Sequence, residues 1–366
     1  MKINTQTFKH GLPILAALFL LTLFGCSDKN QKNGNYIEPT RTGEVIIQNE
    51  PDQPEVIMEG LQVSETGIAY GIDFGKGLPY RLSLTDGSFE HLAESGRGPE
   101  ELTQPNQVYL VSDELQFIND QALDMITEIR NGEVIGKSEG FLAQNIWIRN
   151  TYGIYSDGKL ITAVKDHQNV NELNFENVHA LYIWDMNRET GLLHGKFSTT
   201  LDQLDSFKKY PLMATDNQAE YVYYVFNTDY SVFRLNIETG EIEATSRYRP
   251  EGYRERTMEF DHTNNYHFTV NFSREFSMHI TNVTGIGYLG ERLVVVWNNA
   301  NQNYIQNTYY DAENYDHFGV VYDLPDLSNP REFTLPGKFL GTWGNRMLIE
   351  ENDDVMEYTI GFYEFE

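Results

Sequence analysis

Cysteine is almost absent from this sequence, since Cys26 is the only one among 366 residues. A single cysteine excludes an intramolecular disulfide and any metal site built on several thiolates. Basic residues are also scarce, with 27 Lys and Arg against 54 Asp and Glu and a net charge of −27. A surface this acidic repels phosphate backbones and anionic headgroups, so we expect no nucleic acid and no anionic lipid surface as a partner.

The short motifs of common catalytic and cofactor sites are missing as well. No Gly-x-Ser-x-Gly elbow, Walker loop or dinucleotide fingerprint occurs. His262 and His267 lack the spacing and the glutamate of a His-Glu-x-x-His zinc site. Residues 311–316 offer oxygen ligands without the glycine and terminal glutamate of an EF-hand loop. We therefore expect no cofactor, with calcium as a weakly supported alternative.

The N-terminus has the pattern of an export signal. Lys2 and Lys9 precede an apolar run over residues 12–24, which is too short for a comfortable membrane span. The run ends in Leu-Phe-Gly-Cys26, which resembles the lipobox of bacterial lipoproteins. This resemblance implies cleavage before Cys26 and attachment of lipid to its thiol.

The expected organisation follows from that signal. Residues 1–25 are predicted to be the signal peptide, and residues 26–40 a polar, flexible tether. The rest of the chain would then be held at the cell envelope by a lipid anchor, and we expect the outer membrane as its location.

A turn followed by an apolar strand recurs six times along the remaining chain. The copies begin at Ser64, Ser112, Ser156, Asn217, Leu289 and Trp343. Further strands follow in the first five copies, and four of the tight turns between them hold Gly87, Gly132, Gly191 and Gly240. Four-stranded antiparallel units repeated about every 50 residues stack around an axis. The pattern therefore predicts an all-β, six-bladed β-propeller over residues 41–366, with a β-sandwich or two separate β domains as the alternatives.

The sixth copy is incomplete, because residues 355–365 form one long strand and the sequence then stops. Residues 44–48 are a strand with no blade of their own. We expect these two strands to pair in an antiparallel fashion. The N-terminal strand would then complete the last blade, close the ring and remove an open sheet edge.

A short motif gives the sequence a family resemblance. Residues 94–102 read Glu-Ser-Gly-Arg-Gly-Pro-Glu-Glu-Leu, similar to the Gly-x-Gly-Pro-Gly-Glu-Phe motif of six-bladed propeller lipoproteins of Bacteroidota, which are TolB-like and NHL-like. Glu100 stands where that motif has glycine and Leu102 where it has phenylalanine. The resemblance implies a propeller fold over residues 40–366, and it assigns no catalytic residue.

Strand order places the long connections on one face. In a four-stranded blade, the turns joining strands 1–2 and 3–4 lie at one end, here called the turn face. The connections 2–3 and 4–1 lie at the other end, here called the long-loop face. The long segments fall on that second face: residues 96–104, 165–178, 199–215, 250–278 and 298–317. Loops of this length are uncommon unless they are functional or disordered.

Aromatic, amide and arginine residues gather in these segments. The candidate ligand-binding residues are Arg97, Arg254, Tyr266, His267, Trp297, Asn299, Tyr304 and Tyr310. Rings beside amides suit the C–H faces and hydroxyls of a glycan, and Tyr, Trp and Arg also dominate protein interfaces. Simple packing of long loops onto the propeller explains the same composition.

Two functions are compatible with this pattern. The first is a non-enzymatic, membrane-anchored propeller that binds a glycan or an envelope protein on the long-loop face. The second is a propeller hydrolase, lyase or lactonase that uses scattered carboxylates and histidines at the channel mouth. A buried cluster of Asp, Glu and His would favour the enzyme, and an exposed aromatic surface would favour binding.

Overall fold

Strands dominate the computed structural model, which describes residues 35–48, 60–73, 75–140, 147–165, 179–196, 211–216, 218–226, 229–254, 280–305, 314–354 and 357–366. Two units are distinguished along the chain, Met1–Tyr36 and Ile37–Glu366. The second unit contains all of the described strands. No helix in the described ranges is long and apolar enough to cross a membrane.

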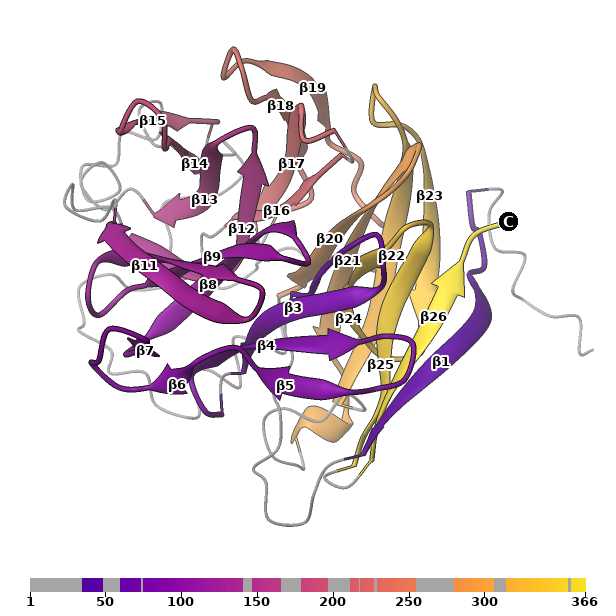
Figure 1. Ribbon diagram of the computed structural model, residues 1–366. Coiled ribbons are helices and arrows are strands. Elements are labelled where there is room, and N and C mark those ends of the chain that lie inside the picture. The colour runs from indigo at the N-terminus through magenta and orange to yellow at the C-terminus, as the bar shows by residue number, and fades with distance from the viewer. Residues whose placement is uncertain are drawn as a thin grey trace, which may run out of the picture. The chain divides into compact units, whose positions relative to one another are not determined.

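Six four-stranded antiparallel sheets are arranged as a β-propeller (Figure 1). Blade 1 contains β2 (Gln62–Val63), β3 (Ile68–Asp73), β4 (Leu78–Ser83) and β5 (Phe89–His91). Blade 2 contains β8 (Pro105–Ser112), β9 (Leu115–Asp120), β10 (Met125–Arg130) and β11 (Glu133–Glu139). Blade 3 contains β12 (Trp147–Ser156), β13 (Lys159–Lys165), β14 (Leu181–Asp185) and β15 (Thr190–His194). The predicted fold class is confirmed.

The second half of the ring repeats this order. Blade 4 contains β16 (Pro211–Thr215), β17 (Tyr221–Phe226), β18 (Val232–Asn236) and β19 (Ile242–Ser246). Blade 5 contains β20 (Asn282–Leu289), β21 (Arg292–Ala300), β22 (Tyr315–Asp323) and β23 (Ser328–Leu335). Blade 6 contains β24 (Lys338–Trp343), β25 (Arg346–Asp354) and β26 (Glu357–Glu364), with β1 (Thr40–Gln48) as its outer strand. A small parallel pair, β6 (Glu94–Ser95) and β7 (Glu101–Leu102), lies between blades 1 and 2.

The first strand of the chain closes the ring, as the incomplete sixth copy predicts. β1 pairs with β26 in antiparallel register from Thr40 opposite Glu364 to Gln48 opposite Glu357. The innermost strands meet as well, because the Leu61 N–H donates to the Leu340 carbonyl at 2.7 Å. Gly341 permits this approach, since a Cβ at that position would lie 2.6 Å from the Leu61 carbonyl oxygen.

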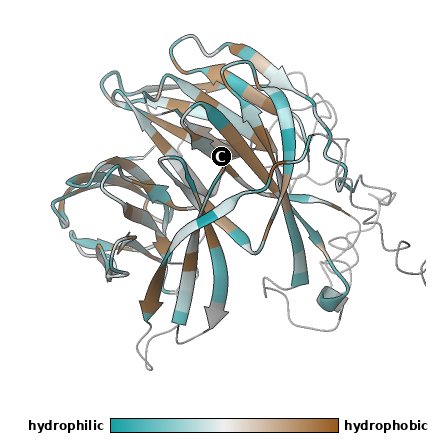
Figure 2. Cartoon of the chain, turned by 90° about the vertical axis from the view of Figure 1, so that its right-hand side faces the viewer, coloured by the Kyte–Doolittle hydropathy of each residue, from teal (hydrophilic) through white to brown (hydrophobic). Residues whose placement is uncertain are grey.

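The core consists of six apolar layers, one between each pair of neighbouring blades. The layer that completes the ring joins Val45, Leu348 and Ile360 of blade 6 to Ala69 and Leu82 of blade 1. Middle strands such as β17 and β21 are buried on both faces, because each blade is covered on two sides. Outer strands such as β11 are mostly exposed. Figure 2 accordingly shows the hydrophobic residues concentrated along the strands.

Candidate ligand-binding face

Strand order confirms the predicted division into two faces. The turns that contain Gly87, Gly132 and Gly240 join third to fourth strands, on the turn face. The turn predicted at Gly191 lies slightly earlier in the chain. The turn in blade 3 ends at Glu189, and Gly191 lies within β15. The strand ends that flank residues 255–279 belong to blades 4 and 5, those that flank residues 306–313 belong to blade 5, and all of them lie on the long-loop face.

A hydrogen-bonded cluster at this end of blade 5 joins the residues that flank 255–279 to the end of β21. The Arg254 N–H donates to the Thr281 hydroxyl at 2.7 Å, and the same hydroxyl donates to Asn299 Oδ1 at 2.6 Å. Asn299 Nδ2 donates to the Gly252 carbonyl at 2.8 Å. Arg254 Nη1 donates to the Ala300 carbonyl at 2.9 Å. Thr281 and Asn299 are buried, so these polar groups fix the chain on both sides of residues 255–279 against the end of β21.

The hairpin of β21 and β22 extends further than expected toward the long-loop face. Its last strand pair is Ala300 opposite Tyr315, and the Asn301 N–H donates to the Asn314 carbonyl at 2.9 Å. Asn301 Oδ1 then accepts the Asn303 N–H at 2.9 Å and begins a single 3-10 turn, Asn303–Ile305. The hairpin therefore presents an ordered support at the start of the segment that follows.

Two of the candidate aromatics have packing positions. Trp297 is fully buried, with its ring stacked on Phe318 at 6.2 Å and its indole N–H donated to the Asp229 carbonyl at 3.2 Å. Tyr304 is 3% exposed and its ring lies 5.4 Å from that of Tyr315. Neither ring is open to a ligand in this arrangement. The expectation of an exposed stacking surface at these two positions is corrected to a packing role.

The other candidates are placed differently. Asn299 and Arg254 belong to the buried cluster described above, where they hold backbone in place. Arg97 is exposed and makes no ion pair with any residue that the structure describes. Tyr266, His267 and Tyr310 lie outside the described residues, as does Cys26.

The glycine-rich motif at residues 94–102 forms a compact turn around a carboxylate. Glu101 Oε2 accepts the Gly98 N–H at 2.7 Å, and a Cβ on Gly96 would collide with the same carboxylate. The Thr103 hydroxyl donates to the Gly96 carbonyl at 2.8 Å. Leu102 is fully buried in the layer between blades 1 and 2. The motif therefore docks the connection between these blades, and it leaves Arg97 at the surface.

Buried aspartates that the sequence analysis did not single out end two strands on this face. Asp120, the last residue of β9, accepts the N–H groups of Thr103 at 2.7 Å and Gln104 at 3.0 Å. Asp73, at the same position in blade 1, accepts the Gly75 N–H at 2.9 Å. Both are completely buried. Their equivalent strand positions are the sequence signal that could have found them.

Asp73 also pairs with a histidine. Its second oxygen lies 2.9 Å from His91 Nε2, and the His91 side chain is 19% exposed. The two residues are 18 positions apart in sequence, so no local pattern predicts the pair. No group of three or more His, Cys, Asp or Glu side chains among the described residues is arranged to hold a metal ion.

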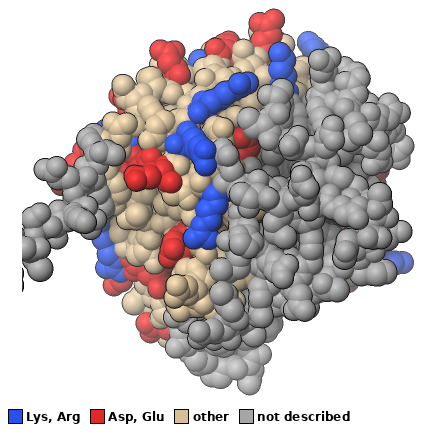
Figure 3. All heavy atoms as spheres, turned by 180° about the vertical axis from the view of Figure 1, so that it is seen from behind, with Lys and Arg blue, Asp and Glu red and all other residues tan. Residues whose placement is uncertain are grey.

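Charge is not uniformly distributed over the described surface. On the face seen in Figure 3, Lys and Arg side chains form a short row between separate acidic residues. The net charge of −27 therefore does not fix the sign of the field at any one site.

Comparison with known proteins identifies relatives in fold alone. No family model and no curated protein matches the sequence. The solved structure of a DUF4221 family member from Bacteroides vulgatus superposes with a TM-score of 0.70 at 10% identity, covering 91% of this chain and 99% of that one. A Bacteroides fragilis protein described as exported superposes with a TM-score of 0.57 at 10% identity, covering 92% and 97%. The likeness is one of architecture.

These two neighbours agree with part of the predicted resemblance. Both come from Bacteroides, and both match the six-bladed propeller over almost their whole length. Neither is described as TolB-like or NHL-like, so that finer assignment stays a prediction.

Proposed function

We propose that this chain is an exported, lipid-anchored propeller that binds a ligand on its long-loop face without catalysing a reaction. The observation that carries the proposal is the hydrogen-bonded cluster of Arg254 with the buried residues Thr281 and Asn299, which fixes the residues flanking 255–279 against the end of β21. Such a support requires buried polar groups, and it holds the described ends of segments rich in Tyr, Asn, His and Arg at this end of the propeller.

The carboxylates on this face support binding over catalysis. Asp120 is occupied by two backbone N–H groups, and Asp73 by backbone and His91. A glycosidase needs two carboxyl groups facing a common space. The aspartates described here instead hold connections in place.

Export and anchoring rest on the N-terminal sequence, with the export description of the B. fragilis neighbour in support. β1 begins at Thr40 on the turn face, because Thr40 lies opposite Glu364 at the end of β26. Residues 27–39 span at most about 45 Å when fully extended. A lipid at Cys26 would therefore be connected to the propeller through the strand end on the turn face.

The anchor has a direct test. Replacing Cys26 with Ser removes the thiol that accepts lipid, so metabolic labelling with a palmitate analogue should label the original chain and leave Cys26→Ser unlabelled. Persistent label on the variant contradicts the anchoring proposal.

The ligand is proposed to be a glycan or an envelope protein, and a glycan array with a thermal-shift screen of the chain from Asn35 separates them. A bound glycan should raise the melting temperature, because ligand at about 100 times its Kd adds about 2.7 kcal/mol of stability. Array binding without product release supports the binding function. Turnover of a bound glycan would contradict it.

One observation favours the enzymatic alternative. In the Asp73–His91 pair a buried carboxylate holds an imidazole, as in sites where a histidine acts as a general base, and the pair lies on the long-loop face. If a substrate is turned over, His91→Gln should abolish that turnover while leaving the melting temperature close to that of the original chain.

A further inference from the structure

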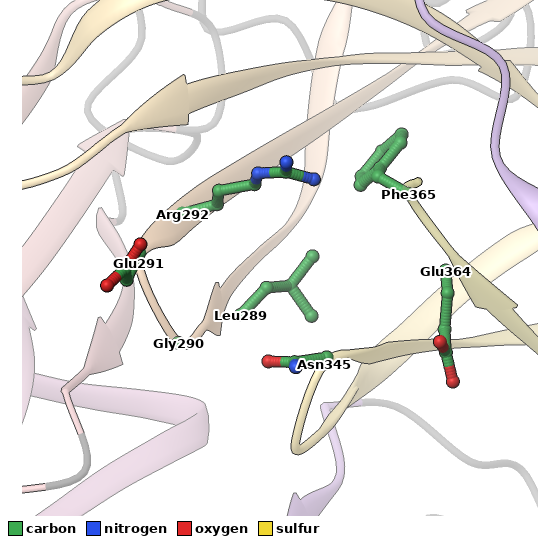
Figure 4. Close-up of a pocket in the computed structure, with 7 residues that line it drawn as sticks. All are labelled: Leu289, Gly290, Glu291, Arg292, Asn345, Glu364 and Phe365. Atoms are coloured by element: carbon green, nitrogen blue, oxygen red, sulfur yellow. The ribbon is translucent and has the colours of Figure 1, made fainter.

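A pocket of about 450 Å³ lies on the turn face, in the seam between blades 5 and 6 (Figure 4). The β20–β21 turn supplies Leu289 and Arg292, the β24–β25 turn supplies Asn345, and Phe365 follows β26. This is the end of the propeller opposite to the proposed ligand-binding face. The pocket is therefore independent of that proposal.

Arg292 is the notable group in this pocket. Its side chain makes no hydrogen bond or ion pair with any residue in the described ranges. Its cross-strand neighbour Asp323 bonds to other residues: the Asp323 carboxylate accepts hydrogen bonds from Arg331 at 2.7 Å and from Asn329 at 3.0 Å. Figure 4 shows the Arg292 guanidinium extended across the pocket toward the Phe365 ring. A half-buried cation without a counter-ion is a ready partner for an anion.

The acidic residues near the pocket do not neutralise Arg292. Glu364 accepts a hydrogen bond from Arg346 Nε at 2.9 Å. Glu291 is exposed at the turn. In Figure 4 both carboxylates point away from the space between Arg292 and Phe365. Arg292 is therefore the one cation among the lining residues, and the two carboxylates point away from the space beside it.

The other lining residues include apolar side chains, Leu289 and Phe365, and the polar side chain of Asn345 at the surface. Leu289 is 5% exposed, and the Phe365 ring packs edge-on against Phe333 with centroids 5.0 Å apart. Asn345 is exposed, and its Oδ1 lies over Gly290. Pockets of this size commonly combine an apolar floor with a few polar groups that orient the ligand.

We propose that this pocket binds a small organic carboxylate with an apolar body. The carboxylate pairs with the Arg292 guanidinium, whose planar fork matches two carboxylate oxygens. The apolar body lies on Leu289 and Phe365. A phosphate is disfavoured, because Arg292 is the one cation in the pocket lining and the doubly charged ligand would be repelled by Glu291 and Glu364.

The test compares two ligands that differ only in this charge. N-acetyl-leucine and N-acetyl-leucinamide are titrated into the full chain in a non-ionic detergent, and binding is followed by saturation-transfer NMR. The carboxylate should bind about tenfold or more tighter than the amide, which corresponds to one charge-assisted hydrogen-bonded contact. Arg292→Gln should reduce carboxylate binding to the level of the amide and leave amide binding unchanged. Arg292→Lys should be intermediate, since it keeps the charge and loses the fork.

Two controls make the result specific. Arg247→Gln removes the same charge from an exposed position outside the pocket, and it should leave both affinities unchanged. The melting temperature of Arg292→Gln should match that of the original chain, because the substitution keeps the backbone pairing of β21 and the Arg292 side chain bonds to no described residue. The proposal is overturned if the two ligands bind equally, if neither binds up to its solubility limit, or if Arg247→Gln weakens the carboxylate as much as Arg292→Gln does.

Discussion

Arg41 on β1 and Glu351 on β25 form a two-point ion pair: Nε and Nη2 of Arg41 donate to the two carboxylate oxygens at 2.8 and 2.6 Å. The residues are separated by 310 positions in the sequence. The pair therefore repeats through side chains the closure that β1 and β26 make through the backbone. Tyr363 Oη adds a third hydrogen bond to Glu351 at 2.5 Å.

This pair predicts an acid-sensitive contribution to ring closure. The hydrogen bond from Arg41 lowers the pKa of Glu351, and the hydrogen bond from Tyr363 lowers it further. A carboxylate with a lowered pKa in the folded state stabilises the fold above its ordinary value, about 4.3, and loses that contribution as the pH falls through the lowered value. Glu351→Gln should therefore unfold at lower urea concentration than the original chain at pH 7.

The difference between the two chains should shrink as the pH falls below about 4, because Glu351 is by then largely protonated in the unfolded chain and becomes protonated in the folded chain as the pH falls through its lowered pKa. The effect should be modest, since Arg41 is 44% exposed and solvent screens the pair. Urea midpoints measured from pH 7 to pH 3 check the trend. A difference that stays constant across this range would contradict the ion-pair explanation.

Trp297 gives a prediction that separates packing from binding. Its indole is completely buried between blades 4 and 5 and donates to the Asp229 carbonyl. Trp297→Ala should lower the free energy of unfolding by about 3–5 kcal/mol through the cavity that it leaves. Calorimetric melting measures the loss. If Trp297→Ala is as stable as the original chain and binds ligand more weakly, Trp297 contacts the ligand and the packing explanation is wrong.

The glycine-rich motif predicts a local difference between two adjacent glutamates. Glu101 accepts the Gly98 N–H, so Glu101→Ala should lower the free energy of unfolding by about 1–2 kcal/mol. Glu101→Gln should cost less, because its amide oxygen still accepts that N–H. Exposed Glu100 is the matched control, and Glu100→Ala should change stability by less than about 0.5 kcal/mol. Equal losses at the two positions in urea denaturation would refute the proposed turn.

Local signals are sufficient to predict the architecture. Glycine turns and apolar strands recur in a fixed order, and strand counting alone assigns β1 to the last blade and the long segments to one face. Strand ends are less predictable. Asn298, Asn299 and Ala300 have low β-propensity, yet pairing with β22 extends β21 to Ala300. Trp297 therefore lies inside a strand, where its ring joins the core.

Tertiary contacts between distant residues account for what the sequence does not predict. The Asp73–His91 pair and the hydrogen bond from the Thr103 N–H to Asp120 form only after the fold has brought separate parts of the chain together. The turn-face pocket likewise depends on two turns and the chain end meeting at the seam of blades 5 and 6. Each of these contacts joins residues from separate elements, so the local pattern around either residue does not predict it.

The central claim, that the ligand binds the long-loop face, is tested most directly by blocking one face at a time. A chain that begins at Asn35 lacks Cys26 and therefore has no thiol. In that chain, Gln302→Cys or Arg188→Cys introduces one exposed thiol, which is then modified with a bulky polyethylene glycol maleimide. Gln302 follows β21 on the long-loop face, and Arg188 lies in the β14–β15 turn. Binding to a ligand found by the array should be lost when Gln302→Cys is modified and kept when Arg188→Cys is modified. Loss at Arg188→Cys with binding retained at Gln302→Cys would contradict the claim.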